Sequence, residues 1–358
     1  MKYRPLDIAL GRKAAAHIAE HGWQGADIRT LLGASGGPKW LILGHLDRLL
    51  FAEFLFRARE HPLQAIGSSV GSWRHACLAQ EDPAEAIGRF EEVYVNWDYG
   101  PRPNAGSISA ASLAMLDRIF GESGARALID HPLLHSYIIT ARGRGLNSAR
   151  SAPALATGMG SAALANALGR PLLASQFQRV VFASPGAPPL PFSDFSTCHA
   201  TLSADSVARA LHASGAIPFL LNGERDLPGG PEGQYWDGGI IDYHFDLVPI
   251  AGEGLLLYPH FRADLTTGWF DKLLPWRRHR APDLERLILL SPSPAFLASL
   301  PMGKIPDRSD FRRLRPADRI HYWRQCVDRS RELADDLRWQ FEQSDPLMNT
   351  RLLGEPLS

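Results

Sequence analysis

Two spacings of apolar residues alternate along this chain, and they predict strands and helices in turn. Short apolar runs bounded by Gly or Pro are typical of buried strands, and the first two are expected at 26–32 and 63–66. Between them, apolar residues recur at helical spacing from Pro38 to Phe54. Because strands that alternate with helices form parallel sheets covered on both faces, the pattern predicts an α/β fold with a mostly parallel central sheet.

The same patterns continue toward the end of the chain. Further strands are expected at 136–141, 179–183, 254–258 and 287–290. Helices are expected at 14–20, 73–79, 84–95, 108–120, 203–214 and 317–342. The stretch 143–169 is rich in Gly, Ala and Ser, and it leaves small-residue helices and a mobile cover as alternatives. We expect one domain over residues 1–358, with a partly irregular inserted segment at about 90–175 and a C-terminal helix at about 317–342.

Composition narrows the classes of function. Lys plus Arg and Asp plus Glu both number 38, so no net charge attracts nucleic acid, and we expect no nucleic-acid partner. The three cysteines lack C-x-x-C spacing, which favours reduced thiols over a disulfide framework or a metal site. The first residues lack the apolar core of a signal peptide, and no apolar run approaches the length of about 18 residues that spans a membrane. We therefore expect a cytoplasmic location, with at most peripheral contact at a membrane surface.

Two segments match the pattern G-x-S-x-G, with Ser35 and Ser69 at their centres. In this pattern a strand turns sharply into a helix, and glycines two places either side of the serine let the backbones pass. Gly67 and Gly71 would have that role around Ser69. The serine then projects in front of a helix N-terminus, where backbone amides can receive a developing oxyanion. We interpret Ser69 as a nucleophile, although the spacing alone does not choose between the two serines.

A nucleophilic serine also needs hydrogen-bond donors for the oxyanion. Gly36 and Gly37 are two successive glycines between a predicted strand and a predicted helix, so their amides can stay unbonded, and Lys39 adds positive charge nearby. A phosphate-binding loop is the alternative. The spacing fits neither G-x-G-x-x-G nor G-x-x-x-x-G-K-[ST], which weakens that alternative.

The base required by such a serine is predicted at Asp237. Gly238 and Gly239 follow it and leave the carboxylate beside an open backbone. A plain turn aspartate is the alternative, since Asp-Gly is a common turn signal. Just upstream, residues 213–218 (Ala-Ser-Gly-Ala-Ile-Pro) read as a helix end that runs into an extended segment fixed by proline.

In this order the four segments resemble the patatin-like phospholipase family. That family carries a Gly-rich loop with a basic residue, a G-x-S-x-G elbow, an A-S-x-A-I-P-like segment and D-G-[GA]. The matching segments here are 35–39, 67–71, 213–218 and 237–239, within about 28–249. The resemblance implies a three-layer α/β/α fold, with Ser35 in the oxyanion loop and Ser69 at the nucleophile.

The resemblance also implies a Ser–Asp dyad that works without histidine, metal or cofactor. Ser69 would attack an acyl ester, and Asp237 would take its proton and later activate water. The amides of Gly36 and Gly37 would hold the tetrahedral oxyanion. The expected substrates are fatty-acyl esters of phospholipids, lysophospholipids or neutral lipids, which makes the chain a lipolytic esterase of phospholipase A or lysophospholipase type.

A lone aspartate is a weak base, since an unperturbed carboxylate has a pKa of about 4. It can activate a serine only through a short hydrogen bond in a site dry enough to raise its basicity. We therefore expect the carboxylate of Asp237 within hydrogen-bond reach of the Ser69 hydroxyl.

Three departures from the family pattern leave alternatives open. The loop begins with Ser35 where glycine is usual. Trp40 stands where the family commonly has glycine, and the N-x-P that often follows D-G-G is absent. A catalytically idle acyl-binding relative is one alternative, and Trp40 is its only support. The other is an ordinary triad of Ser69, an acid and His260, because the chain order Ser, acid, His is that of α/β-hydrolases.

The stretch 269–280 mixes bulky aromatic residues with cations. Such a mixture suits a lipid–water interface, where Trp lies at headgroup level and Arg meets phosphate. The alternative is a basic loop whose aromatic side chains pack on the core. Burial of both Trp269 and Trp276 would exclude the interfacial role.

Overall fold

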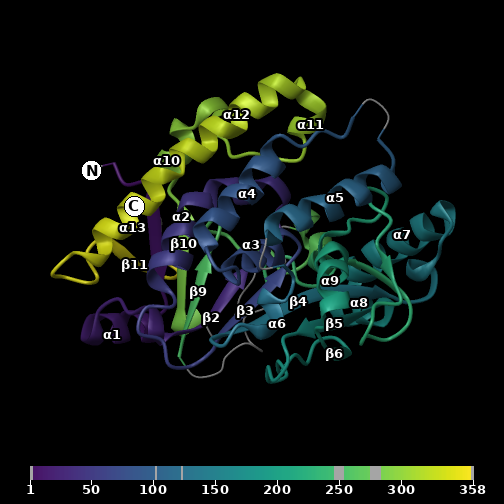
Figure 1. Ribbon diagram of the computed structural model, residues 1–358, viewed down its shortest axis with the longest axis horizontal. Helices are drawn as coiled ribbons and strands as arrows, with labels where there is room; N and C mark the ends of the chain where they lie inside the picture. Colours follow the sequence, from purple (N-terminus) through teal and green to yellow (C-terminus); the bar gives the residue numbers. More distant parts are fainter. Residues whose placement is uncertain (1–2, 101–102, 122–123, 246–253, 275–283, 356–358) are drawn as a thin grey trace.

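The computed structural model describes residues 3–100, 103–121, 124–245, 254–274 and 284–355. In these residues a mostly parallel sheet lies at the centre and helices flank it, which is the predicted three-layer α/β/α architecture (Figure 1). The strands are β1 (Leu6–Leu10), β2 (Ile28–Gly33), β3 (Leu63–Ser68), β4 (Leu134–Gly143), β5 (Phe177–Ala183), β6 (Thr197–Thr201), β7 (Glu224–Arg225), β8 (Gln234–Asp237), β9 (Leu255–Pro259), β10 (Leu287–Pro292) and β11 (Thr350–Leu352).

The α-helices of the described residues connect and cover these strands. They are α1 (Arg12–His21), α2 (Gly44–Arg48), α3 (Val70–Leu78), α4 (Pro83–Val95), α5 (Ala105–Phe120), α6 (Ala127–Asp130), α7 (Ala152–Leu168), α8 (Arg170–Gln176), α9 (Ala204–Gly215), α10 (Pro294–Ser299), α11 (Asp310–Arg313), α12 (Pro316–Arg329) and α13 (Arg331–Phe341). None of the helices in the described ranges has the length and apolar character needed to cross a membrane.

The sheet has the strand order β11-β1-β10-β9-β2-β3-β4-β5-β6, and β8 pairs with β4 outside this path. Its inner strands are buried almost throughout, which explains why they read as continuous apolar runs in the sequence. Near the chain ends, β1 pairs with β10 and with β11 (Figure 1). Both ends therefore belong to the same sheet, which supports the proposal that residues 1–358 form one domain.

Several elements differ in detail from the sequence predictions. The helix expected from Pro38 to Phe54 divides into a 3-10 segment, the short α2 and a π-helical segment at Leu49–Phe54. The C-terminal helix expected at about 317–342 is two helices, α12 and α13, joined at Ser330. Within the range of about 90–175, α7 accounts for the small-residue stretch and β4 lies in the middle of the sheet.

Strand β4 organises the end of the sheet that matters for function. It runs parallel to β3 until Ser68 pairs with Ile139. There β3 ends, and β8 takes its place beside β4, so that Asp237 pairs with Thr140. The end of β3 and the end of β8 are far apart in the sequence. They thereby lie beside consecutive residues of β4, which are Ile139 and Thr140.

Candidate active site

Ser69 occupies a sharp corner between β3 and α3. Its backbone has φ 55° and ψ −130°, a conformation that residues other than glycine rarely adopt. The glycines on either side are needed for close approach of backbones. A Cβ on Gly71 would lie 1.9 Å from the carbonyl oxygen of Gly33, and one on Gly67 would lie 2.6 Å from the Ser72 backbone. The local sequence therefore fixes the strained turn that presents the serine.

Ser214, near the end of α9, connects this corner to the sheet. The amide of Ser69 donates to Ser214 Oγ at 2.9 Å, and that hydroxyl donates to the carbonyl of Ile139 at 2.6 Å. The side chain is fully buried. The sequence pattern at 213–218 indicated this segment, but it gave no sign that its serine holds the corner residue in place.

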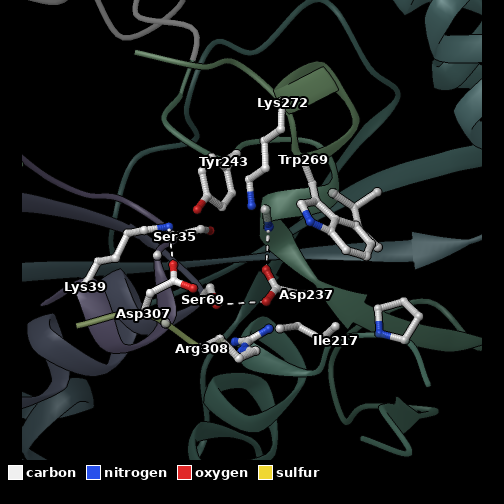
Figure 2. Close-up of a pocket in the computed structure, with 15 residues that line it drawn as sticks. Ser35, Lys39, Ser69, Ile217, Asp237, Tyr243, Trp269, Lys272, Asp307 and Arg308 are labelled. Atoms are coloured by element: carbon white, nitrogen blue, oxygen red, sulfur yellow. Dashed lines mark hydrogen bonds and ion pairs between the residues drawn. The ribbon is translucent and has the colours of Figure 1, made fainter. Parts of the chain in front are cut away.

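Asp237 ends β8 with its carboxylate directed at Ser69 (Figure 2). Ser69 Oγ donates to Asp237 Oδ2 at 2.8 Å, and the amide of Gly239 donates to Oδ1 at 2.7 Å. The residue is 7% exposed. Burial raises the pKa of the Asp237 carboxyl, and the hydrogen bonds from Gly239 and Ser69 offset part of that rise. The carboxylate is consequently a stronger base than an aspartate in water.

The two glycines after Asp237 allow a close fit. A Cβ on Gly238 would lie 2.3 Å from the carbonyl oxygen of Ile139, and one on Gly239 would lie 2.6 Å from Ser35 Oγ. A side chain at either position would therefore clash with these groups and disturb the segment that carries Asp237. Steric access, as well as turn formation, therefore explains the D-G-G sequence.

The loop before α2 brings Gly36 and Gly37 to the same cavity as Ser69. Gly37 has φ 55°, which favours glycine, and neither glycine's amide donates a hydrogen bond to any described residue. Ser35 anchors the loop, since its amide donates to the carbonyl of Tyr243 at 2.9 Å. The Ser35 hydroxyl donates to Ser68 Oγ at 3.0 Å. Of the two candidate serines, it is therefore Ser69 whose hydroxyl donates to the Asp237 carboxylate.

The side chains that follow the loop point in different directions. Lys39 lines the cavity and forms an ion pair with Asp307, with Nζ and Oδ2 3.1 Å apart (Figure 2). Trp40 is 1% exposed and stacks on Phe90 in the core, with ring centroids 4.1 Å apart. The bulky residue that replaces the family's glycine is thus accommodated by the core, and it is not among the residues that line the cavity.

The cavity beside Ser69 has a volume of about 240 Å³. It brings together all four segments that the sequence singled out, represented by Gly36, Ser69, Ile217 and Asp237. It also contains residues that sequence reasoning did not place there, namely Tyr243, Asp307 and Arg308. Tyr243 follows soon after Asp237, whereas Asp307 and Arg308 come from a later loop before α11, and nothing in the local sequence marks any of the three.

A second, narrower cavity of about 50 Å³ adjoins the first. The two share Gly37, Ser69 and Arg308. The second is lined mainly by apolar and aromatic side chains, which are Val70, Trp73, Tyr94, Trp97, Tyr99, Leu220 and Leu221. Ser69 therefore stands where a polar cavity meets an apolar one.

His260, the histidine of the alternative triad, is fully buried next to the ring of Phe261. Its Nδ1 lies 2.6 Å from the carbonyl oxygen of Arg262, and burial lowers the pKa of the imidazole to about 3. Within the described residues it has no hydrogen bond to Ser69 or Asp237, whose carboxylate oxygens are already occupied. The geometry gives this histidine no part in activating the serine.

The aromatic and cationic stretch 269–280 is described only in its first part. Trp269 is half-buried, lines the cavity and packs against an apolar cluster that contains Trp236 and Ile240. Lys272 also lines the cavity, whereas Trp276 lies outside the described residues. No group of three or more His, Cys, Asp and Glu side chains in the described ranges is placed to hold a metal ion.

The family model described as patatin-like phospholipase matches residues 34–244, which is more than half of the chain. The matched segment includes Ser69 and Asp237 and ends before Lys272 and Arg308. No curated protein matches the chain.

Proposed function

Because the chain belongs to the patatin-like phospholipase family, whose members are lipolytic acyl hydrolases, we propose that it cleaves carboxylic esters of acyl lipids with Ser69 and Asp237. The observation that carries this proposal is the 2.8 Å hydrogen bond from the Ser69 hydroxyl to the Asp237 carboxylate. A serine in a strained turn, a buried carboxylate and two amides that donate to no other described residue meet in one cavity, and these are the parts that acyl transfer requires.

In the proposed first half-reaction, Ser69 Oγ attacks the ester carbonyl carbon while its proton passes to Asp237 Oδ2. The amides of Gly36 and Gly37 donate hydrogen bonds to the tetrahedral oxyanion. Collapse of this intermediate breaks the ester C–O bond, and the departing alcohol oxygen takes the proton from Asp237. The product is an acyl-enzyme on Ser69.

In the second half-reaction, Asp237 accepts a proton from water as the water oxygen attacks the acyl-enzyme carbonyl. The second tetrahedral intermediate collapses to the carboxylic acid, and the proton returns from Asp237 to Ser69 Oγ. The raised pKa of Asp237 supports both steps, since a more basic carboxylate takes the proton more readily. Burial also excludes the bulk water that would weaken the hydrogen bonds of the oxyanion loop.

The two cavities that meet at Ser69 suggest how the ester lies. We infer that the carbonyl end of the acyl chain enters the apolar cavity lined by Trp73 and Tyr94. The alcohol part then occupies the polar cavity that contains Lys39 and Tyr243. This orientation puts the scissile carbonyl at the junction, beside both Ser69 and Gly37.

A panel of short-chain and long-chain acyl esters tests the proposal. We expect Ser69→Ala and Asp237→Ala to lower kcat/KM at least about a thousandfold, as loss of a nucleophile or its base does in other serine hydrolases. A fluorophosphonate probe should label the wild type and leave Ser69→Ala unlabelled. Ser175→Ala, on the exposed surface of α8, is the matched serine control and should label like the wild type. Equal labelling of the wild type and Ser69→Ala would overturn the assignment.

We also propose that the stretch 269–280 approaches a lipid surface. The support is that Trp269 and Lys272 extend from this stretch to the cavity itself, so a lipid entering the site would pass them. Co-sedimentation with vesicles containing anionic lipid should weaken in Trp269→Ala. Binding equal to that of the wild type would contradict this role for Trp269.

A further inference from the structure

The cavity beside Ser69 holds more positive than negative charge. Three cations line it, and Lys39 is already paired with Asp307. The side chains of the remaining two, Lys272 and Arg308, form no ion pair and no hydrogen bond with any described residue. Of the two anions that line the cavity, Asp237 is bonded to Ser69. Two cations therefore remain to meet a ligand.

These two cations approach the reacting groups from different sides. Figure 2 shows Lys272 above and Arg308 below the Ser69–Asp237 pair, and both line the same cavity. The ammonium of Lys272 lies over the Tyr243 ring, 3.7 Å from its centroid. A Cβ on Gly37 would lie 3.1 Å from Arg308 Nη2, so the guanidinium adjoins the proposed oxyanion loop. Both residues are exposed as a whole and both line the cavity, although the ammonium of Lys272 lies deep enough for burial to lower its pKa.

Tyr243 adds a neutral donor to the same wall. Burial raises the pKa of its hydroxyl, which keeps the proton on the oxygen at neutral pH. Its hydroxyl forms no hydrogen bond with any residue in the described ranges. The ammonium and the guanidinium can give a phosphate group strong charge-assisted hydrogen bonds, and a guanidinium can bind two phosphate oxygens at once. The phenol adds a neutral donor.

The position of Arg308 decides which part of an ester would carry that phosphate. Arg308 and Ser69 both lie at the junction of the polar and apolar cavities. With the carbonyl end of the acyl chain at the apolar cavity, the alcohol part would extend past Arg308 toward Lys272, because both residues line the polar cavity. An anionic group close to the alcohol oxygen would therefore meet both cations.

We propose that Lys272 and Arg308 bind a phosphate group on the alcohol part of the substrate and make the chain selective for acyl esters of phosphorylated alcohols over those of neutral alcohols. This inference rests on the proposed function and goes beyond it. Both residues lie outside the segment that the family model matches, so the selectivity belongs to this chain's own later part. The region after 244 would thus supply specificity to a site built by the region before it.

The two cations could also act on catalysis through the pKa of Asp237, and this role can be distinguished from phosphate binding by comparing substrates. Their charges also favour the ionised form of Asp237. Removing either charge would then raise the pKa of Asp237 and change the rate on every ester by the same factor. The ratio of kcat/KM between a phosphorylated and a neutral substrate cancels that shared factor and reports binding of the phosphate group alone.

The test compares 1-octanoylglycerol 3-phosphate with 1-octanoylglycerol, which share the acyl chain and the scissile bond. We expect the wild type to prefer the phosphate ester by about tenfold or more, as charge-assisted hydrogen bonds allow. Lys272→Gln and Arg308→Gln should each lower this ratio by about tenfold. Arg312→Gln, an exposed arginine on α11 that does not line the cavity, should leave the ratio unchanged. A wild-type ratio near one, or equal losses on both substrates, would overturn the proposal.

A binding measurement that needs no turnover separates this inference from the proposed function. Calorimetry with glycerol 3-phosphate should show binding to the wild type and to Ser69→Ala, and about tenfold weaker binding to Arg308→Gln. The same titration with inorganic phosphate shows whether the phosphate group alone suffices. Equal affinity for both ligands would support a phosphate site, and tighter glycerol 3-phosphate would support a headgroup site. Absence of binding by either ligand would overturn the inference, even if Ser69-dependent ester turnover is found.

Discussion

The hydroxyl of Ser69 and the carboxylate of Asp237 lie 2.8 Å apart although 168 positions separate them in the chain. Strand β4 positions both residues. Ser68, which directly precedes Ser69, pairs with Ile139, and Asp237 pairs with the next residue, Thr140. The distance between the two side chains is therefore set by the register of two strands against a third. A change in either register by one residue would turn one of these side chains to the other face of the sheet.

Asp237→Asn is expected to abolish turnover while raising the melting temperature at pH 8. Burial raises the folded-state pKa of this carboxyl above its unfolded value. The stability it contributes is therefore fully present below the unfolded pKa and is lost as the pH rises through the folded pKa. Asparagine removes that loss, so the advantage of the variant should shrink as the pH is lowered toward about 4. Thermal melts of both proteins from pH 4 to pH 8 check this, and a less stable variant at pH 8 would contradict it.

Ser214→Ala is expected to lower kcat more than it changes KM. The substitution removes the acceptor of the Ser69 amide and the donor to the Ile139 carbonyl, and each buried group left unsatisfied costs about 1–3 kcal/mol. The corner serine would then be less well held, and kcat should fall about tenfold to a hundredfold. Ser72→Ala is the control, because Ser72 Oγ also contacts Ser214 Oγ. Its removal leaves in place the bonds of Ser214 with the Ser69 amide and the Ile139 carbonyl. Equal losses in both variants would argue against the anchoring role.

Gly71→Ala is expected to destabilise the fold by about 3 kcal/mol or more, because its Cβ would lie 1.9 Å from the Gly33 carbonyl oxygen. Gly160→Ala is the matched control in α7, where a Cβ meets nothing within 4 Å. That variant should gain about 0.5–1 kcal/mol, since alanine is the better helix former. Urea unfolding of both variants measures the contrast. A Gly71→Ala protein as stable as the wild type would show that the elbow relaxes without cost.

His260→Gln should keep ester turnover within about threefold of the wild type when both are assayed well below their melting temperatures. The imidazole has no hydrogen bond to Ser69 or Asp237 in the described part of the chain. Burial already lowers its pKa to about 3, so it is neutral in the assay range. A loss of about a thousandfold in kcat would instead restore the histidine triad.

Phosphate binding should weaken as the pH rises above neutrality. Burial and then the charge of Lys39 lower the pKa of Lys272 to about 7, so the ammonium loses its proton across this range. A phosphodiester is the suitable ligand because its own charge is constant there. Affinity measured from about pH 6 to pH 9 should fall for the wild type and stay level for Lys272→Gln. A parallel decline in both proteins would assign the pH dependence to another group.

The sequence by itself determined those features that depend only on neighbouring residues in the chain. The turn around Ser69 needs residues without a side chain where two backbone segments approach closely. Gly67 and Gly71 therefore indicate this turn in the sequence. The same steric argument holds for Gly238 after Asp237. The apolar runs of β2, β3 and β10 predicted the central sheet, because strands buried on both faces have few polar positions.

Only the tertiary structure decided which of these pieces meet. Strand β8 has no alternating pattern of apolar and polar residues. Its sequence Gln-Tyr-Trp-Asp gave no sign that it pairs with β4 beyond the end of β3. The same holds for Arg308, whose guanidinium reaches Gly37 from a loop near the end of the chain. Strand register and loop packing arise from the whole core at once. A local pattern can therefore indicate a reactive side chain, but the fold decides what faces it.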